Sequence, residues 1–369
     1  MRLHHPTSST LASLLLACLA CTPSDASDDA GEGTGTTGED QTLAEGWSAI
    51  EVELVASGCT LDAGPASLAW AQLFPEGYAM GPLVDDGAGG VVIVGGADDE
   101  ARVVDLDPDG SVRWARSYTT GEALDVDASP DGQIAIGGGS DGAGWVWTLS
   151  AGGWTRWGDD LGQTVRHVSV ASDAVMVGDA NDDLSRYAID DGTLIYGQGG
   201  GSLEGLVDDT AGGFWVGEWV QIGFLGLVLE LTHYDAAGEI VASLDDDLLE
   251  LFAMAHDEQG RLVYLAELTD TSVRIRLGNA DGNVGGQQSV PSDYGDPKTL
   301  AMGPGDDLLL GFSNQLIYYD TDANELWTGV LSCEGQPVTI DELAIDAERR
   351  SWIVGHLASR EIVALVDPI

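Results

Sequence analysis

The chain of 369 residues carries 62 acidic residues against 14 basic ones, a formal net charge of −48 at pH 7. This balance argues against nucleic acid and anionic lipid as partners, because both are polyanions. It favours a solvated surface adapted to a salty medium, in which screening relieves the self-repulsion of the carboxylates. A surface that collects divalent cations is the alternative interpretation.

Residues 1–17 read as an export signal, with a weakly basic start and an apolar run, Leu11 to Ala17, that is too short to span a bilayer. Leu15-Leu16-Ala17-Cys18 resembles the lipobox of bacterial lipoproteins, which implies cleavage before Cys18 and lipidation of that cysteine. Cys21 is a poorer candidate for the same role. An ordinary cleaved signal with two incidental cysteines is the alternative. Because no aspartate follows Cys18, the resemblance implies the outer membrane of the cell envelope.

Residues 18–46 are predicted to be an acidic, disordered tether. From Thr22 to Gly46 only Leu43 is a large apolar residue, so the segment cannot bury enough surface to offset the entropy of ordering. Its charges are all acidic, which keeps it extended. Residues 47–66 form a lead-in segment, and residues 67–369 form the folded body.

The folded body contains one recurring short apolar strand. Its copies begin at Gly89, Gly132, Asp173, Gly212, Gly260, Asp306 and Ser351. The equivalent positions Gly95, Gly137, Gly178, Gly217, Leu265, Gly311 and Gly355 are separated by 39 to 48 residues. That spacing is typical of a four-stranded propeller blade, and Asp-Gly pairs beside the strands supply the tight hairpins. The pattern predicts an all-β fold: a single β-propeller of about seven blades.

The seventh copy reaches the end of the sequence without a fourth strand. The segment SLAWAQLF, Ser67 to Phe74, matches the outer strands of other copies and is predicted to complete the last blade and close the ring. From Ser67 onward the chain resembles the WD40-like and quinoprotein-like propellers of bacterial lipoproteins. It lacks their Trp-Asp signature, and the Gly-to-Trp spacing of four typical of quinoprotein repeats is identified at Gly110 to Trp114.

Carboxylates occur on both faces of the expected propeller. Pairs such as Asp85-Asp86, Asp208-Asp209 and Asp306-Asp307 fall in short turns and are predicted to be structural. The opposite, loop-bearing face is the expected working face. The weak calcium candidates on it are Asp98, Asp99, Asp182 and Asp183. None of them stands in a spaced Asp-x-Asp-x-Asp-Gly loop.

The fourth copy carries large apolar side chains in or beside a loop of this acidic face. They are Trp219, Ile222, Phe224 and Leu225. Such residues are costly in water, so they are a candidate binding patch. The alternative is that they pack on a neighbouring blade or cap the channel.

Cys59 and Cys333 are the pair that remains once the cysteines of the signal region are set aside. An exported protein meets oxidising conditions, so this pair predicts a disulfide. Cys59 precedes the closing strand and Cys333 follows the outer strand of the sixth copy, which puts both near the ring closure.

No catalytic residues are identified. The histidines His167, His233, His256 and His356 fall in different blades without metal-ligand spacing. We expect a tethered, monomeric binding or scaffold module without a cofactor, calcium being the one possible ion. Its partner would be a protein or another envelope component, and only the lipid anchor would meet the membrane. The alternative is an envelope enzyme with a cofactor, such as a quinone, in the channel.

Overall fold

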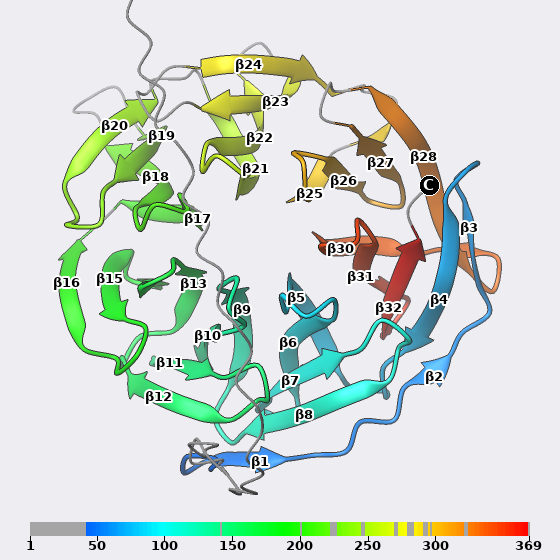
Figure 1. Cartoon of the computed structure of the whole chain (residues 1–369), viewed down its shortest axis with the longest axis horizontal. Coiled ribbons are helices and arrows are strands. Elements are labelled where there is room, and N and C mark those ends of the chain that lie inside the picture. Colours follow the sequence, from blue (N-terminus) through cyan, green and yellow to red (C-terminus); the bar gives the residue numbers. More distant parts are fainter. Residues whose placement is uncertain are drawn as a thin grey trace, which may run out of the picture. The chain divides into compact units, whose positions relative to one another are not determined.

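A computed structural model describes residues 42–367, except 141, 200, 222–226, 245–247, 269–271, 279–283, 291–293, 296 and 321–323. These residues form seven antiparallel sheets arranged as the blades of a ring, the β-propeller expected from the repeat (Figure 1). In each blade the first strand lies nearest the centre and the fourth lies outside. Among the described residues no helix is long and apolar enough to cross a bilayer.

The first four blades follow the chain in order. Blade 1 is β5 (Ala79–Asp85), β6 (Val91–Ala97), β7 (Glu100–Leu106) and β8 (Val112–Tyr118). Blade 2 is β9 (Glu122–Ala128), β10 (Ile134–Ser140), β11 (Ala143–Leu149) and β12 (Thr155–Asp160). Blade 3 is β13 (Val165–Val170), β14 (Ala174–Asp179), β15 (Asp183–Ala188) and β16 (Leu194–Gly199). Blade 4 is β17 (Ser202–Asp208), β18 (Phe214–Gln221), β19 (Leu227–Tyr234) and β20 (Ile240–Leu244).

Blades 5 to 7 complete the ring. Blade 5 is β21 (Leu248–His256), β22 (Leu262–Leu268), β23 (Val273–Gly278) and β24 (Val284–Ser289). Blade 6 is β25 (Pro297–Met302), β26 (Leu308–Phe312), β27 (Leu316–Tyr319) and β28 (Glu325–Cys333), with β29 (Gln336–Pro337) paired to β28. Blade 7 is β30 (Thr339–Ile345), β31 (Ser351–Leu357), β32 (Arg360–Asp367) and β4 (Ser67–Leu73). The recurring apolar strand of the sequence is therefore the second strand of every blade.

The ring is closed by the N-terminal strand, as the sequence predicts. β4 pairs antiparallel with β32, so that Ser67 lies opposite Asp367 and Leu73 opposite Ile362. The fourth strand of blade 7 therefore comes from the opposite end of the folded body. This pairing covers the outer edge of β32, and β2 (Val55–Ala56) pairs with part of the other edge of β4.

The lead-in segment runs around the outside of the ring, where it adds three short strands (Figure 1). β1 (Trp47–Ala49) pairs with β8, β2 (Val55–Ala56) with β4, and β3 (Cys59–Asp62) with β28. The packed chain starts before Gly46, since Leu43 packs on the core and the Ala44 N–H donates to Thr155 Oγ1 at 2.7 Å. This outer belt, residues 42–62, thus links blades 2, 1, 7 and 6.

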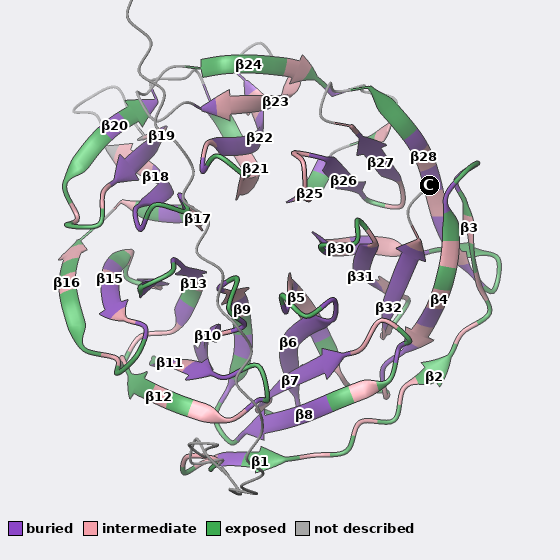
Figure 2. Cartoon of the chain, viewed as in Figure 1, coloured by how far each residue is buried: buried purple, intermediate pink, exposed green. Residues whose placement is uncertain are grey.

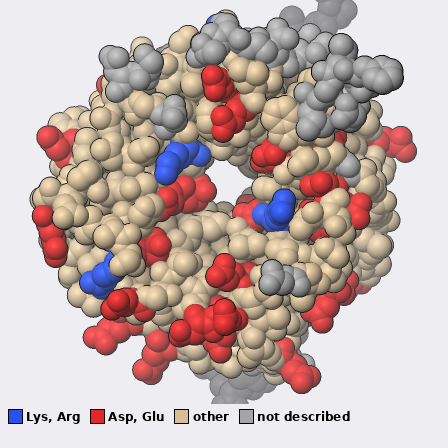
Figure 3. Space-filling model, turned by 180° about the vertical axis from the view of Figure 1, so that it is seen from behind, with Lys and Arg blue, Asp and Glu red and all other residues tan. Residues whose placement is uncertain are grey.

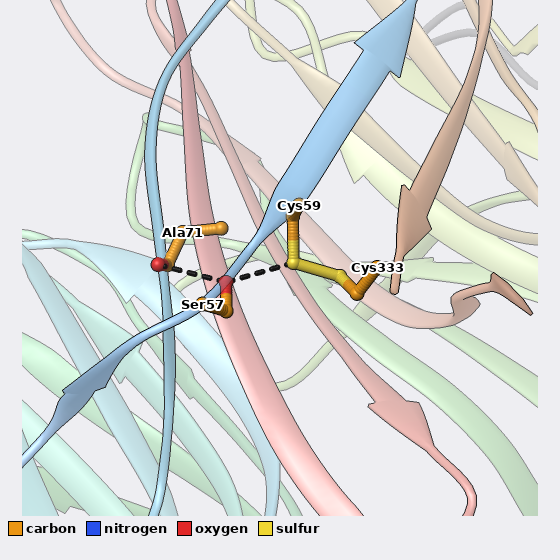
Figure 4. Close-up of a disulfide and its surroundings, with 4 residues drawn as sticks. All are labelled: Ser57, Cys59, Ala71 and Cys333. Atoms are coloured by element: carbon orange, nitrogen blue, oxygen red, sulfur yellow. Dashed lines mark hydrogen bonds between the residues drawn. A yellow bond between two sulfur atoms is a disulfide. The ribbon is translucent and has the colours of Figure 1, made fainter. Parts of the chain in front are cut away.

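The belt carries the disulfide between Cys59 and Cys333, the pair expected from the sequence (Figure 4). The two cysteines lie directly opposite each other in the β3–β28 pairing. Beside them, Ser57 Oγ lies 2.8 Å from Cys59 Sγ and donates to the Ala71 carbonyl at 2.9 Å. The covalent bond and these contacts tie blade 6 to the closing strand of blade 7.

The hydrophobic core lies between adjacent blades. Buried side chains concentrate on the second and third strands of the blades, whereas the first strands are mostly half-buried and much of the outer strands is exposed (Figure 2). One cluster joins Val91 and Ile93 of β6 to Trp352 and Val354 of β31, all fully buried. Each blade therefore buries its apolar faces against two neighbours, which explains why the second strands are apolar on both faces.

An aromatic side chain on the outer strand of one blade also covers a turn glycine of the next. The Trp114 indole N–H donates to the Ala151 carbonyl at 2.9 Å, and a Cβ on Gly153 would lie 2.6 Å from the Trp114 ring. Trp70 covers Gly110 and Trp157 covers Gly192 in the same way. These glycines have positive φ.

The Gly-to-Trp spacing of four is not confined to Gly110 and Trp114. Besides Gly110 to Trp114 it occurs at Gly153 to Trp157. In each case the tryptophan ring of the preceding blade packs over the glycine. The tryptophan four residues later packs in turn over a glycine of the following blade. Each Gly-to-Trp pair therefore contributes to two contacts between blades, one with the preceding blade and one with the following blade.

Candidate functional site: the central channel

A buried aspartate organises the turn between the first and second strands in several blades. Asp346 Oδ1 accepts the N–H groups of Glu348 and Arg350, and its Oδ2 accepts from Trp352. The other aspartates with this turn bonding are Asp86, Asp209 and Asp257. For Asp86 and Asp209 the prediction of a structural role is confirmed.

The residue before each of these aspartates points to the opposite side of the strand, because side chains alternate along a strand. In blades 1, 4 and 5 that residue is Asp85, Asp208 and His256, and all three line one cavity with Asp127. The cavity measures about 510 Å³ and lies at the tight-turn end of the channel. A deeper part of about 300 Å³ shares these four residues. Figure 3 shows the open channel with carboxylates beside it.

His256 and Asp208 form an ion pair in this cavity, with Nε2 2.9 Å from Oδ1. Burial lowers the pKa of His256, but the hydrogen bond and charge of Asp208 outweigh it and raise the pKa to about 9. The imidazole is therefore protonated at neutral pH and neutralises one carboxylate of the channel.

Asp85 and Asp127 have no such cationic partner in direct contact among the described residues. Burial, together with the charge of Asp86, raises the pKa of Asp85 to about 7. Burial and the charge of Asp208 raise the pKa of Asp127 to about 7. Both carboxylates would gain from a cation in the channel, because it would favour their charged forms.

The carboxylates of β9 also hold the neighbouring blade. Asp125 Oδ2 accepts the Val168 N–H at 2.8 Å, and Asp127 Oδ2 accepts the Val170 N–H at 2.7 Å. These N–H groups belong to β13, the innermost strand of blade 3, whose free edge faces the channel. Burial raises the pKa of Asp125 to about 8 despite this bond. Asp125 and Asp127 thus satisfy strand edges as well as line the channel.

The calcium candidates of the loop-bearing face do not gather into a site. Asp98 and Asp99 form a two-residue hairpin between Ala97 and Glu100, both with positive φ. Asp182 accepts the Leu203 N–H of blade 4 at 3.2 Å. Within the described ranges, neither these residues nor Asp183 belong to a group of three ligand atoms within 4.8 Å. In the structure Asp98 and Asp99 form a turn, and Asp182 connects blade 3 to blade 4.

The candidate apolar patch is described only at Trp219. This side chain is partly buried and packs against the core cluster that includes Trp215 and Leu229. Ile222, Phe224 and Leu225 lie outside the described residues. Part of the Trp219 surface is thus already used in packing within the propeller.

A second cluster of titratable groups lies in blade 7, at the end opposite the Asp346 turn. His356 Nδ1 is 2.6 Å from Asp341 Oδ2, and Glu361 lies opposite His356 in the β31–β32 pairing. Burial and the charge of Asp341 raise the pKa of Glu361 to about 7. Sequence reasoning missed this cluster. The available signal was a histidine and a glutamate placed symmetrically about a tight hairpin.

No protein-family description and no curated protein sequence matches this chain. Solved structures resemble it in fold. A catalytically inactive His-to-Ala variant of virginiamycin B lyase from Staphylococcus aureus, with quinupristin, has a TM-score of 0.60 and 11% identity over 86% of this chain and 100% of that one. A selenomethionine form of that lyase has a TM-score of 0.59 and 11% identity, covering 84% and 100%.

A chain from the mitotic checkpoint complex also resembles the protein, with a TM-score of 0.57 and 14% identity, covering 77% of this chain and 89% of that one. At these identities the likeness shows the propeller fold alone. It includes an enzyme and a member of a protein complex, so it does not choose between catalysis and binding.

Proposed function

We propose that the protein is an envelope-tethered binding module whose channel takes a basic side chain of a partner protein. The observation that carries the proposal is the pair Asp85 and Asp127, two carboxylates that line the channel without a cation in contact. A guanidinium or ammonium group would supply the missing charge. The net charge of −48 would steer a basic partner toward the protein.

The apolar lining fits the stem of such a side chain. Val170, Met302 and Ile345 line the same cavity of about 510 Å³ as the carboxylates. Lysine and arginine combine an apolar stem with a charged head, and a cavity of mixed lining accommodates both parts. A protein partner also accords with the structural likeness to a chain of a protein complex.

The test is a calorimetric titration with a short capped peptide containing one arginine, against the same peptide with neutral citrulline. We expect only the arginine peptide to bind. Asp85→Asn with Asp127→Asn should weaken binding about tenfold or more, because a hydrogen bond to a charged group is worth about 1.5 kcal/mol or more. Affinity should rise between about pH 6 and pH 8, where carboxylates with a pKa of about 7 become charged while His256, with a pKa of about 9, stays protonated.

The matched control removes the same charge elsewhere. Asp190 and Asp191 are exposed in the turn between β15 and β16, and Asp190→Asn with Asp191→Asn should leave the affinity unchanged. Equal loss of binding in both double variants would mean attraction by the acidic surface in general. Equal binding of the arginine and citrulline peptides would also refute a channel site for a cation.

The tether is proposed to end in a lipid on Cys18, with Cys21 as the alternative acceptor. Mass spectrometry of the mature N-terminus should show diacylglycerol on the cysteine, and Cys18→Ala should move the protein from the membrane fraction to the soluble fraction. Several acyl chains on one residue bind a membrane firmly, whereas one chain is marginal. An unmodified mature N-terminus at another residue would contradict the anchor.

A further inference from the structure

Three metal-ligating side chains converge at one end of blade 7. Asp341, His356 and Glu361 each offer a ligand atom, and these atoms all lie within 4.8 Å of one another. They come from three adjacent strands, β30, β31 and β32. None of the three lines the two channel cavities described above, so the cluster is separate from the proposed cation site.

The backbone explains why these side chains meet. His356 and Glu361 are directly opposite each other in the β31–β32 hairpin. In the β30–β31 pairing the register shifts between Ile340 and Glu342, which leaves Asp341 as the extra residue of a bulge. A bulge changes the direction of a side chain, and here it brings Asp341 Oδ2 to 2.6 Å from His356 Nδ1.

A second observation points to an absent ligand. Glu361 Oε2 is buried from solvent and has no hydrogen-bond partner among the described residues. A buried carboxylate oxygen without a partner is costly, and an ion that the structure lacks is one of its ordinary explanations. His356 and Asp341 remain accessible, with side chains 39% and 31% exposed, so an ion could enter from solvent.

We infer that Asp341, His356 and Glu361 form a binding site for a first-row divalent cation such as Zn²⁺. One imidazole nitrogen and two carboxylate oxygens suit zinc or manganese better than calcium, which takes six to eight oxygen ligands. Ligand atoms about 2.0 to 2.2 Å from one tetrahedral ion lie roughly 3.3 to 3.6 Å apart. The three ligand atoms lie within 4.8 Å of one another, so their separations would close by at most about 1.5 Å when an ion binds. Three protein ligands leave a coordination position open to water.

The test is a titration of the full chain with Zn²⁺ at about 1 M salt and in excess Ca²⁺, conditions that screen and occupy the general acidic surface. We expect one tightly bound Zn²⁺ and a rise in melting temperature on its addition. His356→Gln and Glu361→Gln should each weaken this site about tenfold or more, since each removes a direct ligand. Co²⁺ absorbance should report nitrogen and oxygen coordination that is lost in His356→Gln.

His167→Gln is the matched control, because His167 lies in β13 of blade 3, away from the cluster. It should leave Zn²⁺ binding unchanged, and all variants should melt like the parent protein when no metal is present. Unchanged Zn²⁺ affinity in His356→Gln and Glu361→Gln would overturn the proposal. Absence of tight Zn²⁺ binding by the parent protein would also overturn the proposal, and would leave the cluster with no role beyond the ion pair of Asp341 and His356.

Discussion

Replacing both Cys59 and Cys333 by serine should lower the free energy of unfolding by about 2 to 5 kcal/mol, which is the usual range for loss of a native disulfide. The bond joins residues 274 positions apart, so the chain-entropy model places it near the upper end of that range. The cysteines connect β3 to β28, and β3 contacts the closing strand β4. Urea denaturation with and without reductant measures the effect.

Reductant should destabilise the parent protein by the same amount and leave the double serine variant unaffected. Titration of thiols in the denatured, unreduced protein should find none at Cys59 and Cys333. Equal stability of parent and variant under oxidising conditions would show that the belt is held by its hydrogen bonds and packing alone.

Trp114→Ala should cost about 3 to 5 kcal/mol, as large aromatic deletions in cores do. Trp114 is 7% exposed, its indole N–H donates to Ala151, and its ring covers Gly153. Arg116 reinforces the joint, because its Nε donates to the Gly153 carbonyl at 3.0 Å. The substitution would open the contact between blades 1 and 2, and thermal or urea unfolding would record the loss.

Gly153, which the Trp114 ring covers, can be compared with Gly142, a glycine with a similar positive φ and open space around it. Gly153→Ala would place a Cβ 2.6 Å from Trp114 at a φ of +70°, whereas Gly142→Ala meets open space at a φ of +83°. Both variants carry the cost of a left-handed backbone, about 1 to 2 kcal/mol, but only Gly153→Ala adds the clash, about 1 to 3 kcal/mol. Equal losses in the two variants would mean that the Trp114 ring can move aside freely.

The fold could be inferred from the sequence because each blade carries its own local information. The apolar second strand, such as Val91 to Gly95, is buried on both faces in every blade. The same environment therefore requires an apolar segment in each blade, and this segment recurs along the sequence. Tight turns need residues that adopt positive φ, so Asp-Gly pairs indicate the positions of these turns in the sequence. Ser67 to Leu73 matched the outer strands because it occupies the same environment as they do.

The candidate sites were less accessible to sequence reasoning. Asp85 and Asp86 are neighbours in the chain, yet one lines the channel and the other organises a turn, since the strand alternates its side chains between two sides. The longer loops predict a working face at one end of the propeller. The acidic cavity lies at the tight-turn end, and the cluster of Asp341, His356 and Glu361 lies at the opposite end of its blade. Composition could not separate the carboxylates that serve structure from those that face the channel.

The repeat, the strand that closes the ring and the pairing of Cys59 with Cys333 could all be predicted before the fold was known, because each depends on local pattern or on simple parity. Contacts across blades and strands depend on how the sheets pack and pair. Trp114 covers Gly153 only when two blades are packed, and Asp341 reaches His356 only through a bulge in the register of β30 and β31. A one-residue shift in pairing turns every side chain to the other face, so such contacts are properties of the assembled sheet rather than of spacing along the chain.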